Sequence, residues 1–132
     1  MPFTSKMVKF EIPNISHGLK KANGILRLVD DYLELEFQEK DALVELFKSD
    51  VKVRRIPLCE LESVEYKKGW FSAKILLEAG SMKVLEEIPG SDHGSSVLKV
   101  DRKEKDDARD LVSKIRLKMS ELKLQALDDE DE

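Results

Sequence analysis

The clearest pattern of hydrophobic and polar positions lies near the C-terminus, between Lys105 and Ala126. Apolar residues recur there every three or four positions, as on one buried face of a helix. They are Ala108, Val112, Ile115, Met119, Leu122 and Ala126, with Leu111 beside them. Just upstream, Asp101 and Glu104 have the spacing of a capping box, in which the Asp101 carboxylate accepts bonds from first-turn N–H groups. We therefore predict one long amphipathic helix that buries this stripe.

Shorter segments before the helix alternate between apolar and polar residues, as half-buried antiparallel strands do. The clearest pair is 24–29 and 32–37, joined at Asp30-Asp31, with Glu34 and Glu36 expected to face water. Further strands are expected at 6–12, 62–68, 71–79 and 97–100, and a second hairpin at 43–48 and 51–56. Residues 17–24 indicate a loop, and 81–88 fits either a strand or a helical turn. The pattern predicts a mainly β fold of about seven strands with one C-terminal helix.

The length of 132 residues suits one domain with a core of its own. Because no linker or repeat is visible, we expect a single domain over 1–127, followed by a disordered acidic tail over 128–132. Without the five acidic residues of that tail, the formal net charge changes from −4 to +1. A body so close to neutral attracts nucleic acid weakly, so we expect no nucleic-acid partner.

Cysteine content and the N-terminal sequence bear on the cellular compartment. Cys59 is the only cysteine, which excludes a disulfide within the chain and favours a reducing environment. Its apolar neighbours predict a small buried side chain. Residues 1–14 lack the continuous apolar core of a signal peptide, and no stretch of the sequence is long enough to span a bilayer. We therefore expect a cytoplasmic protein.

Residues that could carry catalysis are few and scattered. The two histidines, His17 and His93, each lie in a loop that contains glycine. Asp92 and His93 stand near Ser95 and Ser96, but neighbours in one loop do not supply the geometry of a catalytic triad, and no nucleophile elbow is present. The sequence also lacks a Cys/His metal spacing, a P-loop and a dinucleotide-binding glycine pattern. We expect no enzymatic activity, no cofactor and no metal.

The first candidate interaction surface is the run Lys67-Lys68-Gly69-Trp70-Phe71, which holds the only tryptophan of the chain. We expect Lys67, Lys68, Trp70 and Phe71 to form a turn between two strands. The aromatic rings could anchor a protein contact, or they could enter an anionic membrane with help from Lys74. Alternatively, the rings could fold back over the sheet while the lysines stay in water.

The second candidate surface is the far half of the helix. A helix of roughly 22 residues is about 33 Å long, more than a small barrel needs as a cap. The stripe repeats every 3.5 residues on average, as in a coiled coil, and Leu117 and Leu124 add a second stripe. We expect the segment from Met119 to Leu127 to contact another chain; the alternative is that its last turns fray or lie along a strand. The candidate residues are Leu117, Met119, Leu122 and Leu124.

The order of the expected elements resembles the pleckstrin-homology-like (PH-like) family, particularly its bacterial and GRAM-type relatives. Gly24–Leu28 followed by Tyr32–Glu36 resembles the opening hairpin of such domains, with the pattern G-x-L-x-L … L-x-L-E. Ile56–Val64 is similar to their link between strands, I-P-L-x-x-I-x-x-V. The closing helix contributes Ala108, Leu111 and Ile115 to the resemblance, which covers about residues 20–120.

The resemblance implies a strongly bent antiparallel barrel of about seven strands, with the helix plugging one open end. It also implies a non-enzymatic module for binding or scaffolding. Eukaryotic members often bind phosphoinositides through basic residues around the first hairpin, whereas this chain has Asp30-Asp31, Glu34, Glu36 and Glu39 there, with only Arg27 as a nearby cation. We expect contacts with an unidentified protein partner, including self-association; the alternative function is peripheral binding to anionic membranes.

Overall fold

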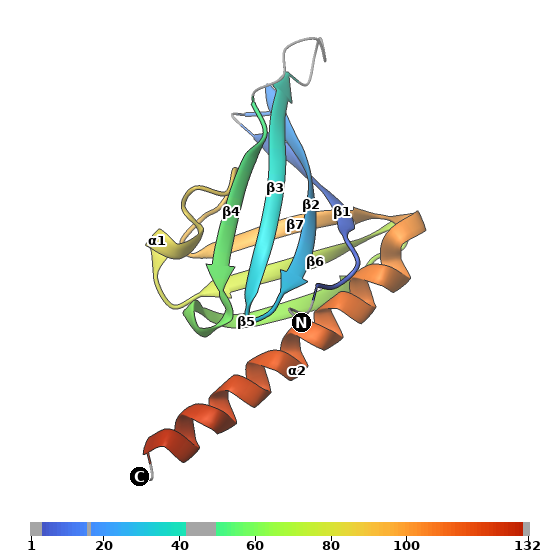
Figure 1. The fold of residues 1–132 in the computed structure, drawn as a ribbon. Helices are drawn as coiled ribbons and strands as arrows, with labels where there is room; N and C mark the ends of the chain where they lie inside the picture. Colours follow the sequence, from blue (N-terminus) through green and yellow to red (C-terminus); the bar gives the residue numbers. More distant parts are fainter. Residues whose placement is uncertain (1–3, 16, 42–49, 131–132) are drawn as a thin grey trace.

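The computed structural model describes residues 4–15, 17–41 and 50–130, in which seven strands precede a long C-terminal helix (Figure 1). The mainly β fold with one C-terminal helix is therefore confirmed. The strands are β1 (Val8–Ile15), β2 (Lys20–Val29), β3 (Tyr32–Asp41), β4 (Lys52–Pro57), β5 (Leu61–Lys68), β6 (Ser72–Ala79) and β7 (Ser95–Asp101). The helical elements are η1 (Leu58–Glu60), α1 (Met82–Leu85), η2 (Arg102–Glu104) and α2 (Lys105–Glu130).

All seven strands belong to one antiparallel sheet in the order β4-β3-β2-β1-β7-β6-β5. Within the described ranges β4 and β5 are not paired with each other, so the sheet stays open at these two ends. Figure 1 shows β1–β4 standing upright and β5–β7 crossing behind them at a steep angle. The expected strong bend is therefore present, but hydrogen bonds between strands do not close a barrel.

The bend lies where β1 meets β7. The only residues in register between these strands are Glu11 and Lys99. Close by, the N–H of Lys9 donates to the carboxylate of Glu104, 3.1 Å away. A side chain from η2 thus satisfies a backbone donor of β1 beside the point where the two halves of the sheet diverge.

The core lies between the two halves of the bent sheet and α2. Alternate residues of each strand point into it, such as Leu33, Leu35 and Phe37 of β3. The helix α2 contacts β1 and β2 in one half of the sheet and β5, β6 and β7 in the other. It buries Ala108, Leu111, Val112, Ile115 and Met119. The helix therefore covers the opening between the two halves.

Three strand boundaries differ from those expected. β1 continues through Pro13 to Ile15, because the pairing register shifts after Ile12 and this irregularity accommodates a residue without an N–H donor. β2 begins at Lys20, inside the expected loop, because β3 is long enough to pair with it as far as Asp41. β4 pairs with β3, and the strand expected at 43–48 lies outside the described residues.

Short helical elements also differ from expectation. The segment that fitted either a strand or a helix forms α1, whose first turn is capped by the Ser81 hydroxyl accepting from the Lys83 N–H. The expected capping box is wrong: Asp101 makes no side-chain cap bond, and Glu104 bonds to β1 instead. Residues 128–130 are helical where a disordered tail was expected, since neither glycine nor proline interrupts α2; residues 131–132 lie outside the described ranges.

Candidate interaction surfaces

The turn between β5 and β6, called here the aromatic turn (Lys67–Phe71), presents two large rings to solvent. Trp70 is 86% exposed and Phe71 is 75% exposed. The interpretation in which the rings fold back over the sheet is therefore wrong. The inward positions of β6 begin at Ala73 and Ile75, so the two aromatic residues precede the part of the strand that reaches the core.

Hydrogen bonds hold the aromatic turn in place. The Gly69 N–H donates to the Ser72 carbonyl over 2.8 Å, and a Cβ atom at Gly69 would lie only 2.4 Å from that oxygen. The Lys105 ammonium donates to the Gly69 carbonyl over 2.8 Å and lies 3.4 Å from the Trp70 carbonyl. The turn is thus tied to the first residue of α2, with its two rings directed away from the core.

Three lysines form a row across the outer face of β5, β6 and β7, called here the lysine ladder. Lys67 pairs in register with Lys74, and Lys74 pairs with Lys99. Directly opposite residues share a face of the sheet, and like charges in such positions repel each other. All three side chains are exposed, and within the described part of the chain none forms an ion pair. The ladder therefore adjoins the aromatic turn as a row of exposed lysines without ion pairs among the described residues.

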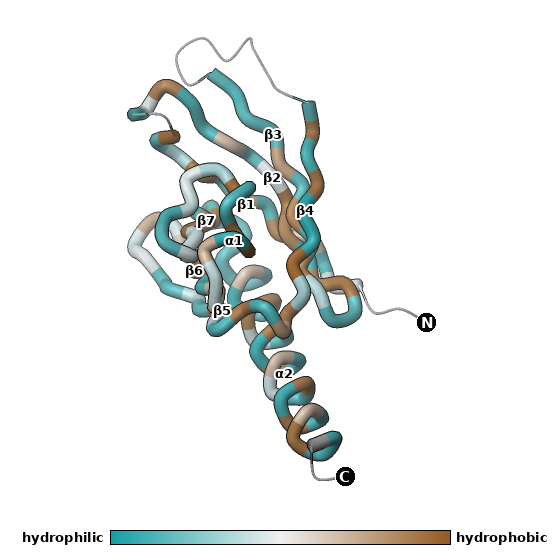
Figure 2. Tube along the Cα trace, turned by 90° about the vertical axis from the view of Figure 1, so that its left-hand side faces the viewer, coloured by the Kyte–Doolittle hydropathy of each residue, from teal (hydrophilic) through white to brown (hydrophobic). Residues whose placement is uncertain are grey.

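The last turns of α2, residues 117–129, are called here the distal helix. Figures 1 and 2 show α2 continuing past the lower border of the sheet, and every side chain from 123 to 129 is exposed. Leu117, Leu124 and Leu127 are 62%, 63% and 57% exposed. Leu122 is half-buried, and Met119 is only 7% exposed because it packs in the core. The prediction that Met119 belongs to an exposed surface is therefore wrong, and the exposed residues 124–129 do not pack against a strand.

A groove of about 740 Å³ runs between the β2–β3 turn and α2. Leu28 and the pair Asp30-Asp31 line one side, and Leu117 and Leu122 lie on the other. Lys114, Lys118, Glu121 and Gln125 complete its lining. The distal helix therefore borders a depression with an apolar floor and charged walls.

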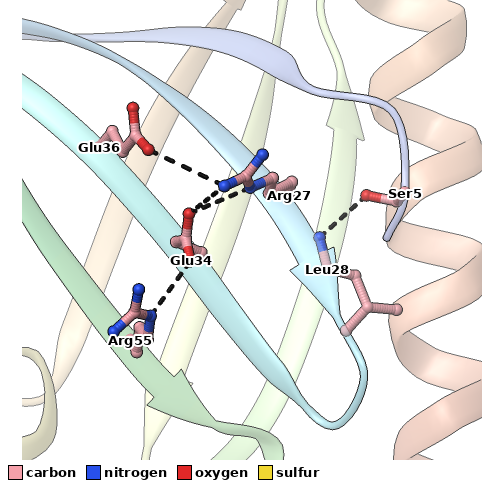
Figure 3. Close-up of polar contacts among 6 residues, drawn as sticks. All are labelled: Ser5, Arg27, Leu28, Glu34, Glu36 and Arg55. Atoms are coloured by element: carbon pink, nitrogen blue, oxygen red, sulfur yellow. Dashed lines mark hydrogen bonds and ion pairs between the residues drawn. The ribbon is translucent and has the colours of Figure 1, made fainter. Parts of the chain in front are cut away.

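A cluster of charges on the outer face of β2, β3 and β4 centres on Glu34 (Figure 3). Its two oxygens accept from the Arg27 Nε and the Arg55 Nε, each 3.1 Å away. Glu34 is only 5% exposed, so the expectation that it faces water is wrong: it points outward, but the arginines cover it. The hydrogen bond from Arg27 lowers the pKa of Glu34 and outweighs the opposing effect of burial, and Arg55 lowers the pKa further. Both arginines are thus engaged within the sheet.

The N-terminal segment is fixed beside the same hairpin. The Ser5 hydroxyl accepts from the Leu28 N–H over 2.9 Å (Figure 3). The same hydroxyl donates to the Lys6 carbonyl. In addition, the Ser5 N–H donates to the Leu28 carbonyl over 2.9 Å. These bonds extend backbone pairing beyond β1 and position the segment near the end of β2.

The loop considered for catalysis does not assemble a triad. His93 Nδ1 lies 2.5 Å from an oxygen of Asp92, and both side chains are largely exposed. The Ser96 side chain is buried, with its hydroxyl 2.5 Å from that of Ser91, and no hydrogen bond between described residues joins it to His93. Cys59 is exposed because it lies on the outer side of η1 while Leu58 points into the core, so the prediction of a buried cysteine is wrong.

No group of three His, Cys, Asp or Glu side chains that could hold a metal ion is found in the part of the chain that the structure describes. Over the same residues, no helix combines the length and the apolar character needed to cross a membrane. No family model matches the chain, and neither do any curated proteins or solved structures. The candidate surfaces therefore rest on the sequence and geometry of this chain alone.

Proposed function

We propose that this chain is a non-enzymatic, PH-like binding domain that acts in the cytoplasm through protein–protein contacts, including self-association. The strand order, the steep bend and the helix over the opening support the PH-like part of the proposal. The observation that carries self-association is the exposed leucine surface of the distal helix, formed by Leu117, Leu124 and Leu127.

The energetics of an uncovered helix end favour pairing. Two or three helical turns are marginal in water, because most helical stability in proteins comes from packing one face. Full burial of a leucine side chain is worth about 1.5–3 kcal/mol. A partner that covers Leu117, Leu124 and Leu127 would supply the burial that the chain's own sheet does not provide.

The charges along α2 favour an antiparallel partner of the same sequence. Reversing one helix about the midpoint between Ser120 and Glu121 places Leu117 of one copy opposite Leu124 of the other, with Asp128 beside Lys114. A parallel pair would instead set Asp128 and Asp129 of both copies side by side. Since opposite charges attract and like charges repel, two copies of this chain would pair their distal helices in opposite directions.

Light scattering on the full chain at several concentrations tests self-association. We expect a mass that rises from monomer to dimer with concentration, and a monomer at all concentrations for the triple variant L117Q/L124Q/L127Q. The matched control is L19Q/M82Q, because Leu19 and Met82 are exposed to a similar degree but lie elsewhere. A wild-type chain that stays monomeric, or a triple variant that still dimerises, would contradict the proposal.

A further inference from the structure

We propose that the aromatic turn and the lysine ladder together form a docking surface for an anionic membrane leaflet. In this arrangement Trp70 and Phe71 enter the boundary between headgroups and acyl chains, and the lysines contact the headgroups. The surface lies at the β5–β6 turn and not on the distal helix, so the inference stands whether or not the chain self-associates.

The rings provide the apolar part of this surface. Tryptophan in particular favours the membrane interface, where its indole N–H stays hydrated while the ring leaves water. Because Gly69 and Lys105 fix the backbone of the turn, little conformational entropy is lost when the rings insert. Trp70 and Phe71 are therefore already exposed in a fixed turn before the chain meets a membrane interface.

The lysines provide the electrostatic part. Lys74 lies between Lys67 and Lys99 on one face of the sheet, an arrangement that costs stability in the isolated domain and is compensated by an anionic surface. Lys68 and Lys105 add positive charge at the turn. The facing carboxylates are Glu65, two residues before Lys67 on β5, Glu11, opposite Lys99, and Asp101, which follows Lys99 by two residues and lies opposite Ser72.

The lysines of this surface outnumber the carboxylates around them, since Lys67, Lys68, Lys74, Lys99 and Lys105 stand against Glu11, Glu65 and Asp101. Glu11 lies at the far end of the row, against Lys99. Along β5, Glu65 lies two residues further from the turn than Lys67. Five lysines against three carboxylates leave an excess of two positive charges, and Lys67 and Lys74 lie opposite each other near the rings. Charge complementarity thus favours a negatively charged leaflet that meets the rings and these lysines together.

Fluorescence of the full chain with lipid vesicles tests the inference, because Trp70 is the only tryptophan and reports its own surroundings. The probe is a vesicle of phosphatidylcholine and phosphatidylserine at about two to one, with pure phosphatidylcholine vesicles as the comparison. We expect a blue shift of the emission with the anionic vesicles that diminishes as salt is added, and no comparable shift with the neutral ones.

Substitutions separate the contribution of the ladder from that of overall charge. Each lysine near an anionic leaflet contributes roughly fivefold to partitioning, so K67Q/K74Q/K99Q should weaken vesicle binding by about two orders of magnitude. The control K20Q/K52Q/K83Q makes the same charge change at exposed sites on β2, β4 and α1 and should have a much smaller effect. In addition, Phe71→Ala should weaken binding severalfold while leaving Trp70 as the reporter.

Thermal unfolding of the same variants checks that the fold is intact. Removing three like charges from one face should leave the melting temperature unchanged or raised, so weaker binding by the ladder variant would not reflect unfolding. The single variant Lys74→Gln gives a second, milder test of the ladder. The inference is overturned if anionic vesicles produce no shift, if neutral vesicles produce an equal one, or if the control triple weakens binding as much as the ladder triple.

Discussion

Glu34 shows how a single outward-facing carboxylate can become part of the structure. Its neighbours across the sheet, Arg27 on β2 and Arg55 on β4, donate to different oxygens of the carboxylate. The guanidinium of Arg55 also lies over the ring of Tyr32, 6.0 Å from its centre. Glu34 thereby links three strands, and both Arg27 and Arg55 are paired with its carboxylate.

The lowered pKa of Glu34 predicts an acid-sensitive contribution to stability. A folded-state pKa below the ordinary value of about 4.5 means that the stabilisation is present above that pH and is lost as the pH falls through the folded-state pKa. Glu34→Gln should therefore lower the free energy of unfolding by about 1–2 kcal/mol at pH 7. The difference from wild type should shrink as the pH falls below about 4.5, because a protonated Glu34 resembles glutamine.

Denaturant unfolding at pH 7 and pH 3 measures this effect. The matched control is Glu36→Gln, since Glu36 is more exposed and its carboxylate lies 3.9 Å from Arg27. That variant should change stability by less than about 0.5 kcal/mol at either pH. A gap between wild type and Glu34→Gln that stays constant from pH 7 to pH 3 would show that the ion pairs are not its origin.

Gly24 predicts a steric effect at one residue of β2. A Cβ atom there would lie 2.1 Å from the Glu36 carbonyl oxygen and 2.8 Å from the Phe10 ring. Because the carbonyl belongs to a paired strand and cannot easily move, Gly24→Ala should cost at least about 2 kcal/mol. Gly80→Ala is the control, since its nearest contact would be the flexible Glu62 side chain at 3.6 Å, and it should change stability by less than about 0.5 kcal/mol. Thermal unfolding that ranks the two variants equally would contradict this account.

At the scale of elements, α2 is one continuous helix with two different surroundings. Its first half packs on both halves of the sheet, whereas its last two turns have no cover within the described chain. The change occurs near Leu122, which is half-buried. The apolar stripe that begins at Ala108 therefore packs in the core as far as Met119, whereas the exposed Leu117 and Leu124 belong to the second stripe.

This division predicts opposite outcomes for two apolar side chains only five residues apart. Met119→Ala should lower the free energy of unfolding by about 2 kcal/mol or more, because it removes a buried side chain. Leu124→Ala should change it by less than about 0.5 kcal/mol at concentrations where the chain is monomeric, because that side chain is exposed. Chemical unfolding at low protein concentration compares them, and a large loss for Leu124→Ala would mean that the distal helix packs within its own chain.

Sequence patterns predicted the helix and the 24–37 hairpin well, because both depend on local periodicity. They could not predict where the sheet stops supporting α2, so Met119 was expected on the interaction surface together with Leu124 although it is buried. The capping prediction at Asp101 failed for a similar reason: Glu104 finds its partner in Lys9, far away in the chain. Contacts between residues far apart in the sequence therefore determine burial and capping, which local spacing alone cannot predict.

At the scale of the whole molecule, pairing register creates features that no single strand displays. Lys67, Lys74 and Lys99 are unremarkable within their own strands and become a ladder only when β5, β6 and β7 align. The aromatic turn was recognisable from the sequence because its residues are contiguous. The ladder beside it was missed in part, since Lys99 attracts attention only after its register with Lys74 is known.

The open ends of the sheet have a consequence for how the chain behaves when concentrated. A strand at the end of a sheet offers unpaired backbone groups, on which strands of other molecules can add and grow into aggregates. On β4 this edge carries Lys52, Arg54 and Arg55 and ends at Pro57, which has no N–H to donate. An incoming copy of β4 would bring Lys52 against a like charge and would meet a ladder interrupted at Pro57, whereas Arg54 and Arg55 are ion-paired with Glu87 and Glu34. The molecule thereby discourages fibril growth along β4 while leaving its helix free for more selective association.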